Sequence, residues 1–330
     1  MKKIIPLPSL TKKIKNILKR ILPLLLGVFF IWYSYSNTTA SDRQNIIDSI
    51  REANYFWIVL SMLMGILSHI IRAVRWNLLL EPLGYRPKII NNVLALLVGY
   101  LANLGIPRSG ELLRATTVST YEDIPFQKAF GTIITERIID VLMLLIIVFI
   151  TGILQTEIIL DYFSDKEINF VKIIITLTVL GVLGISFLYF IKKAKGGFLG
   201  KIKAFVKELL EGVLSIFKMK KKWLFLFYTF AIWGLYIFMF WVIKWSLPET
   251  NTLSLNAILA SFVAGAFAVS ATNGGVGLYP IAVSQILIFY GISSNAGDAF
   301  GWIMWSAQTS MIVIFGALAF LFLPIYNKNK

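Results

Sequence analysis

The charged residues whose spacing best fits binding chemistry lie in the stretch PRSGELLR. Arg108, Glu111 and Arg114 follow Pro107 there at intervals of three residues. A helix that begins after Pro107 would place all three side chains on one face. The first turn of such a helix favours an anion, because its backbone N–H groups form the positive end of the helix dipole. The stretch therefore predicts a site for an anionic group.

Three ionisable residues open a later apolar run, in the stretch TERIIDVLMLL. Glu136 and Asp140 lie one helical turn apart, and Arg137 lies beside them. Acidic residues contribute little to membrane topology, so we expect these two to pair with a nearby arginine, namely Arg108, Arg114 or Arg137. The neighbouring arginines argue against a divalent metal at the two carboxylates.

Two more arginines, Arg72 and Arg75, end an earlier apolar run in the stretch RAVRW. A buried role in an anion site is one interpretation. The other is that both side chains anchor the span, with their charged ends extended to the membrane surface. The sequence leaves these two interpretations open.

No motif of a catalytic site or a cofactor site is present. The chain lacks HExxH, a Walker loop and a serine with a usable histidine and base, and it has no cysteine. The single histidine, His69, is expected to face a helix bundle rather than to bind metal. We expect no enzymatic activity, no catalytic residue, no metal and no cofactor. An enzyme acting on a lipid phosphate through Glu136 and Asp140 is the least favoured alternative.

The composition shows what surrounds these charges. Hydrophobic residues make up 57% of the chain and charged residues 15%, in repeated apolar runs of about twenty residues. This pattern predicts an all-α, polytopic membrane bundle, folded as a single domain over residues 1–330. The net charge of +15 then reflects topology signals and attraction to anionic lipid rather than binding of nucleic acid.

Apolar length and basic loops predict the topology. Full spans are expected at about 21–36, 55–76, 131–154, 168–191, 223–245 and 299–323, the first as a retained helix rather than a signal peptide. Four basic segments should be cytoplasmic: the tail 1–20, the loop after Arg75, the loop 192–222 and the C-terminal tail. Both termini are therefore expected on the cytoplasmic side of the plasma (inner) membrane. Apolar residues at helical spacing in 198–217 predict an amphipathic helix on the membrane surface.

Two apolar segments are interrupted. The parity of the spans leaves no full crossing for the first, and the second is expected to be either re-entrant or two short spans. Residues 89–105 and 112–124 flank the first break, which includes Asn103. Residues 256–272 and 278–292 flank the second, which holds Asn273, Gly274, Gly275 and Gly277. The parity of the loops makes the two hairpins enter from opposite sides. Such paired breaks are typical of transporters with a site near the bilayer midplane. Close helix packing is the alternative reason for the glycines.

Taken together, the motifs resemble the flippase-like integral membrane family that includes the transmembrane half of bacterial lysylphosphatidylglycerol synthases. The resemblance covers about residues 20–323. The motifs are R-x-x-R-W, N-x-x-x-P-R-x-G-E-x-x-R, E-R-x-x-D and G-G-x-G. They correspond to Arg72, Arg75, Trp76, Asn103, Pro107, Arg108, Gly110, Glu111, Arg114, Glu136, Arg137, Asp140, Gly274, Gly275 and Gly277.

What the resemblance implies is movement of an anionic, glycosylated or aminoacylated lipid between leaflets, with these residues near the substrate. The sequence departs from the family pattern at Ala271, where a proline would be expected, and at Pro280, where an acid would be expected. Coupling through that acid is therefore in doubt. No soluble aminoacyl-transferase domain appears in the sequence, so we expect no synthesis of lysyl lipid by this chain.

The main rival to a transporter is a membrane scaffold. In that reading the basic helix 198–222 holds a lipid-modifying enzyme as a partner, and its neutralisation does more damage than that of Arg108 and Arg114. The identity of the lipid, the direction of transport, the energy source and the oligomeric state have no signal in the sequence.

Overall fold

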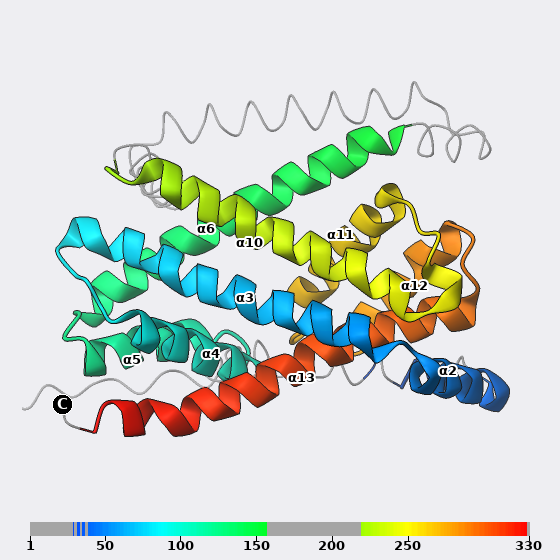
Figure 1. Ribbon diagram of the computed structural model, residues 1–330, viewed down its shortest axis with the longest axis horizontal. Coiled ribbons are helices and arrows are strands. Elements are labelled where there is room, and N and C mark those ends of the chain that lie inside the picture. Colours follow the sequence, from blue (N-terminus) through cyan, green and yellow to red (C-terminus); the bar gives the residue numbers. More distant parts are fainter. Residues whose placement is uncertain (1–28, 30–31, 34, 37–38, 157–218, 329–330) are drawn as a thin grey trace, which may run out of the picture. The chain divides into compact units, whose positions relative to one another are not determined.

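The computed structural model describes residues 29, 32–33, 35–36, 39–156 and 219–328. All regular structure in these residues is helical (Figure 1), which confirms the predicted all-α fold. The α-helices are α2 (Ala40–Glu52), α3 (Tyr55–Leu80), α4 (Ile89–Gly105), α5 (Gly110–Tyr121), α6 (Phe126–Leu154), α10 (Lys222–Ile243), α11 (Leu255–Ala271), α12 (Leu278–Phe289) and α13 (Ser294–Tyr326). Short 3-10 helices lie at η1 (Glu81–Leu83), η2 (Lys244–Ser246) and η3 (Pro248–Thr250).

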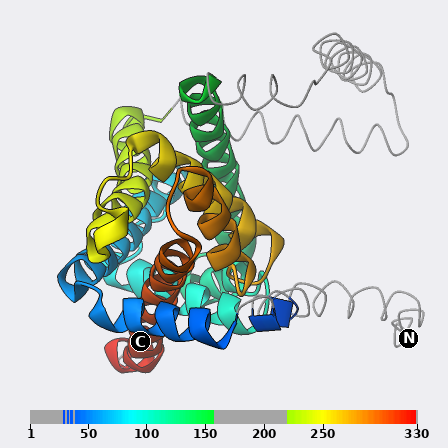
Figure 2. The same ribbon diagram turned by 90° about the vertical axis from the view of Figure 1, so that its right-hand side faces the viewer.

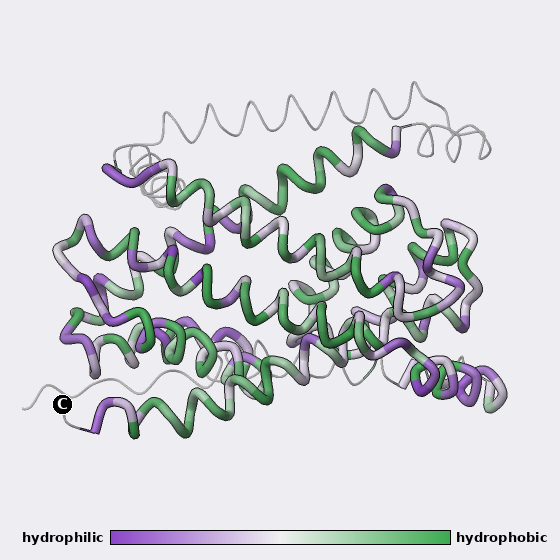
Figure 3. Tube along the Cα trace, in the orientation of Figure 1, coloured by the Kyte–Doolittle hydropathy of each residue, from purple (hydrophilic) through white to green (hydrophobic). Residues whose placement is uncertain are grey.

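Four of the described helices are long and apolar enough to cross a membrane, namely α3, α6, α10 and α13. Apolar residues cover most of their length, and polar residues gather at helix ends and turns (Figure 3). These helices match the spans predicted near 55–76, 131–154, 223–245 and 299–323. The chain is therefore a multi-pass membrane protein. The span predicted at 168–191 and the helix predicted at 198–217 lie outside the described residues, as does most of the span predicted at 21–36.

Two pairs of short helices occupy the positions predicted for the broken hairpins. The arms α4 and α5 have 17 and 12 residues, and the arms α11 and α12 have the same two lengths. A 12-residue helix rises only about 18 Å, less than the ~30 Å of a bilayer core, so α5 and α12 are too short to cross. The two hairpins lie at opposite ends of α3 (Figure 1), as expected of hairpins that enter from opposite sides.

Side chains and backbone geometry set where the helices begin and end. Asn54, Ser254 and Ser293 each accept a hydrogen bond from a backbone N–H in the first turn of the helix that follows. The first hairpin breaks at Pro107, which cannot donate a helical hydrogen bond. The second breaks at glycines, which accept the positive φ values found there.

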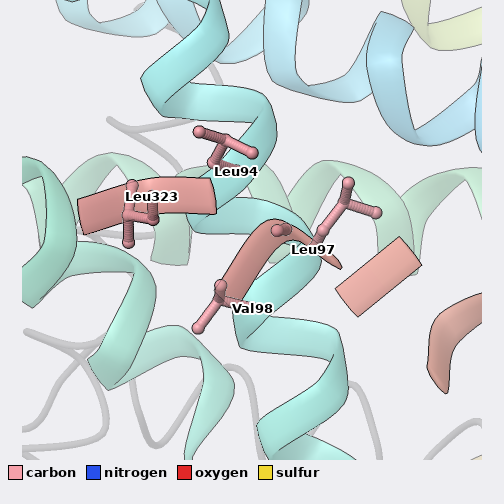
Figure 4. Close-up of a cluster of buried hydrophobic side chains, with 5 residues drawn as sticks. Leu94, Leu97, Val98 and Leu323 are labelled. Carbon is pink, nitrogen blue, oxygen red and sulfur yellow. The ribbon is translucent and has the colours of Figure 1, made fainter. Parts of the chain in front are cut away.

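The first hairpin packs against helices α13 and α3. Leu94, Leu97 and Val98 of α4 form a buried cluster with Ala319 and Leu323 of α13 (Figure 4). Gly316 makes this approach possible, because a Cβ there would lie 3.0 Å from the carbonyl oxygen of Leu97. The other end of α13 contacts α2 (Figure 2). No helix is predicted between the spans at 21–36 and 55–76, so α2 is an additional element.

The chain divides into two compact units, residues 1–133 with 225–330, and residues 134–224. Both hairpins and α3 belong to the first unit, whereas α6 enters the second at Ile134. The prediction of a single membrane domain stays a prediction.

Candidate functional site

Side chains of the first hairpin form hydrogen bonds with the backbone where the helix is interrupted. The Oδ1 atom of Asn103 accepts a hydrogen bond from the N–H of Gly110 at 2.7 Å, at the start of α5. The hydroxyl of Ser109 donates to the carbonyl oxygens of Ala102 at 3.1 Å and Ile106 at 2.8 Å. The N–H of Gly110 lies in the first turn of α5, where a helix leaves its N–H groups without intrahelical partners, and Asn103 supplies the acceptor. Asn103 was predicted as a binding residue, and its observed role is to position the start of α5.

The arms of the first hairpin touch through two glycines. A Cβ on Gly99 would lie 2.8 Å from the carbonyl oxygen of Gly110, and a Cβ on Gly110 would overlap the carbonyl oxygen of Gly99. No other residue type fits between the two backbones without a shift. This contact fixes how closely α5, which carries Arg114, lies against α4.

Arg108 does not share a helical face with Glu111 and Arg114, so that prediction is wrong. Helix α5 begins only at Gly110, and Arg108 lies in the preceding turn with a φ of 62°. This left-handed conformation reverses the chain between the arms and costs an arginine about 1–2 kcal/mol. Arg108 is exposed, whereas Glu111 is half-buried and Arg114 is buried. Glu111 and Arg114 do lie on one face, three residues apart in α5.

The two arginines of α3 are buried and contact α10. Arg72 is 3% exposed and donates through Nη2 to the hydroxyl of Tyr236 at 3.1 Å. Arg75 is fully buried and donates through Nη1 to the hydroxyl of Thr229 at 3.0 Å, with its guanidinium 5.4 Å from the ring centroid of Phe225. The alternative in which both side chains extend to the membrane surface does not describe this arrangement.

Arg114 lies on the face of a tryptophan. Its guanidinium carbon is 3.8 Å from the ring centroid of Trp76, the residue that follows Arg75, and both side chains are buried. The indole N–H of Trp76 donates to the hydroxyl of Thr132 at 2.9 Å, which fixes the ring. Trp76 therefore holds the Arg114 guanidinium in one orientation, and a buried cation over an aromatic face gains about 2 kcal/mol.

The acidic residues of α6 belong to the second unit. Glu136 is fully buried and Asp140 is 8% exposed. Nη1 of Arg137 lies 3.7 Å from Oδ2 of Asp140, which confirms the pairing of Asp140 with Arg137. Pairing of either acid with Arg108 or Arg114 stays a prediction.

The second break meets the tip of the first hairpin. Asn273 is buried, and its Nδ2 donates to the carbonyl oxygen of Leu104 at 2.7 Å. The indole N–H of Trp305 in α13 donates to the carbonyl oxygen of Gly274 at 2.9 Å. Gly274, Gly275 and Gly277 all have positive φ, between 65° and 78°. The glycines are thus required by the backbone conformation, beyond any role in helix packing.

Several of these contacts were not predicted from the sequence. The partners Thr132, Thr229, Tyr236 and Trp305 were not among the candidate residues. Thr229 and Tyr236 are seven residues apart in α10 and so lie on one helical face, a signal that the sequence did contain. The contact between Asn273 and Leu104 had no such signal, because its acceptor is a backbone carbonyl.

His69 faces the interior of the first unit, as predicted. Its side chain is buried, and its ring centroid is 4.5 Å from that of Tyr100 in α4. Among the described residues, no group of three or more His, Asp or Glu side chains is placed to hold a metal ion.

Comparison with known proteins gives one family and three relatives. The family model described as lysylphosphatidylglycerol synthase TM region matches residues 20–325. A UPF0104 membrane protein of Pyrococcus horikoshii is 23% identical over 308 residues, covering 83% of this chain and 88% of that protein. A UPF0104 membrane protein of Methanocaldococcus jannaschii is 33% identical over 98 residues, which are 29% of each chain.

The third relative is the glycosyltransferase AglD of Haloferax volcanii. It is 28% identical over 102 residues, which are 31% of this chain and 16% of that protein. The match therefore spans less than a third of two of these three relatives, and most of the length of the other. No solved structure gives a significant match.

Proposed function

Since the chain belongs to the family of the lysylphosphatidylglycerol synthase transmembrane region, we propose that it moves a lipid with an anionic headgroup between membrane leaflets. It acts as a transporter rather than an enzyme. Its membrane is the plasma membrane, and its basic loops and both termini are cytoplasmic. An anionic membrane lipid is its binding partner, and nucleic acid is not.

The observation that carries this proposal is the burial of three arginines beside a broken hairpin. Arg72, Arg75 and Arg114 are each at most 3% exposed. An arginine at membrane depth costs roughly 2.5–3.5 kcal/mol on insertion scales, so buried arginines in a span mark a functional site by default. Arg72 and Arg75 donate to hydroxyl groups and Arg114 lies on an aromatic ring, and these contacts orient each guanidinium. Oriented guanidinium groups suit a phosphate.

The first hairpin supports the same assignment. Arg114 lies one turn into α5, the arm that returns from the break, so a headgroup bound there is near the tip of the hairpin. The second hairpin has no charged residue between Glu249 and Asp298. We therefore assign recognition of the anionic headgroup to the first hairpin and place no charge recognition at the second.

The scaffold hypothesis relies on the basic loop 192–222, most of which lies outside the described residues. No contact in the described residues favours it. It remains the alternative outcome of the test below.

The test is a leaflet-exchange assay in phosphatidylcholine proteoliposomes with trace fluorescent phosphatidylglycerol, in which dithionite quenches the outer leaflet. We expect Arg114→Gln to slow exchange about 10- to 100-fold, since a hydrogen bond to a charged group contributes ~1.5–3 kcal/mol. Arg86→Gln is the matched control, because the side chain of Arg86 is 81% exposed. Its exchange rate should equal that of the wild type.

Folding of each variant is checked by its melting temperature and elution profile, and Arg114→Lys retains the charge. A wild-type exchange rate equal to that of Arg114→Gln, for several anionic lipids, contradicts the proposal. In that case, loss of a co-purifying enzyme on neutralising 198–222 would favour the scaffold.

A further inference from the structure

The tips of the two hairpins are joined by a small contact. Asn273 donates through Nδ2 to the carbonyl oxygen of Leu104 at 2.7 Å. Leu104 lies in the last turn of α4, where a helix leaves its carbonyl groups without intrahelical partners. Beside this bond, a Cβ on Gly274 would lie 3.3 Å from Cδ2 of Leu104. One hydrogen bond thus links the two irregular segments, with the Leu104 side chain close to Gly274.

The base of the first hairpin is held much more firmly than its tip. Asn91, at the start of α4, donates to Asn327 at 3.0 Å and accepts from it at 2.8 Å. Asn91 also donates to Glu122, just beyond the end of α5. These bonds tie both arms of the hairpin to the end of α13, and the apolar cluster around Leu97 and Leu323 packs beside them. The base is therefore held by more hydrogen bonds and apolar contacts than the tip.

The second tip is attached to the same helix. Trp305 of α13 donates to the carbonyl oxygen of Gly274 at 2.9 Å. Three residues with positive φ follow Asn273 within four positions, and Arg108 has positive φ in the opposite break. Irregular backbone between packed helices is where a hinge absorbs changes in φ and ψ. Segments with few contacts open at low free energy.

From this arrangement we propose that the two hairpin tips form the gate of the transport pathway, recorded here in the closed state and held by the Asn273–Leu104 hydrogen bond. This inference rests on the proposed function. An anionic headgroup bound at Arg114 passes the second hairpin only when the tips separate. Because the base has many contacts and the tip has few, separation of the tips requires less free energy than any movement of the base.

The chain has no cysteine, so the gate can be probed with introduced cysteine pairs. Ile106 and Ala271 are exposed, and each lies two residues from one partner of the contact. Spin labels on Ile106→Cys and Ala271→Cys report the distance between the tips. The control pair, Ile106→Cys with Leu113→Cys, lies within the first hairpin and should keep one distance throughout.

In vesicles of phosphatidylcholine we expect a major short distance and a minor long one, with the long one increased by phosphatidylglycerol. Asn273→Ala should raise the ratio of open to closed protein about tenfold, which corresponds to ~1.4 kcal/mol for the lost bond. Ser270→Ala is its matched control. The Ser270 hydroxyl is exposed and bonds only within α11, to the carbonyl oxygen of Ala266.

A short bifunctional thiol reagent across Ile106→Cys and Ala271→Cys should stop exchange of fluorescent phosphatidylglycerol, reversibly if the linker contains a disulfide. The control pair should retain exchange. A single, unchanged distance in every lipid and variant, or full exchange with the tips cross-linked, overturns the gate. If wild-type protein moves no lipid but the tip distance still responds to Asn273→Ala and phosphatidylglycerol, the proposed function fails and the lipid-sensitive tip motion stands.

Discussion

Because of the contact between Gly99 and Gly110, alanine at Gly99 should destabilise the protein, although alanine in place of glycine normally stabilises a helix. Gly99 and Gly234 are both glycines in helix interiors, of α4 and α10 respectively. A Cβ on Gly99 would lie 2.8 Å from the carbonyl oxygen of Gly110, whereas a Cβ on Gly234 would have nothing within 4 Å. The same substitution, glycine to alanine, therefore tests close packing in one place and helix propensity alone in the other.

The size of the effect follows from two terms. Alanine in place of glycine stabilises a helix interior by roughly 0.8–1 kcal/mol, and this gain is common to both variants. At Gly99 the added methyl group overlaps a backbone oxygen that cannot rotate away, and overpacking of this kind costs about 1–3 kcal/mol. Gly99→Ala should therefore be about 1–3 kcal/mol less stable than Gly234→Ala. Gly110→Ala should be less stable still, because its Cβ would overlap the carbonyl oxygen of Gly99.

The measurement is thermal unfolding in one detergent, followed by tryptophan fluorescence, for the wild type and the three variants. The melting temperature should be lowest for Gly110→Ala, higher for Gly99→Ala and higher again for the wild type. Gly234→Ala should melt at or above the wild-type temperature. A Gly99→Ala protein as stable as Gly234→Ala would show that the arms of the first hairpin are not in backbone contact, and would refute the placement of Arg114 derived from that contact.

Two other predictions concern helix starts. Asn103→Ala removes the acceptor for the N–H of Gly110 and should destabilise the start of α5 by about 1 kcal/mol, seen as faster amide exchange at Gly110 and unchanged exchange in α12. At the start of α2, the hydroxyl of Thr39 donates to Asp42 and lowers the pKa of that carboxyl. This interaction stabilises α2 above the ordinary pKa of an aspartate and is lost as pH falls through the lowered value. Thr39→Ala should return the pKa of Asp42 to its ordinary range in a carbon-13 titration, and an unchanged pKa would contradict this.

The spans and breaks were predictable because residue type alone determines them, whatever the tertiary contacts. Twenty or more apolar residues specify a span, and Pro107 or the glycines after Asn273 interrupt one. The predicted segment 89–105 coincides with α4 for this reason. The helix α2 was missed because its residues are polar and only Ile46 is buried, so it has little apolar periodicity.

The site was less predictable, because its geometry depends on backbone conformation and tertiary contact. Three-residue spacing predicted that Arg108 shares a helical face with Glu111 and Arg114. The left-handed turn at Arg108 delays the start of α5 to Gly110, two residues later than a helix that begins directly after Pro107. The stacking of Arg114 on Trp76 joins residues 38 positions apart, and no local pattern encodes it. Polar residues in an apolar helix, such as Thr229 and Tyr236, were the available signal for the partners of Arg72 and Arg75.

The two hairpins are alike in length and unlike in charge, and this difference bears on transport. Their arms have 17 and 12 residues in each case, yet Arg108, Glu111 and Arg114 lie in the first hairpin and the second has no charged residue. A ligand that interacts equally with two states of a protein shifts neither of them. In the proposed transport, an anionic headgroup contacts arginine side chains at the first hairpin and only neutral groups at the second. Such a headgroup can stabilise one state of the protein more than the other. Equal recognition in both states would remove that bias, so the proposed transport draws on the difference in charge between the two hairpins.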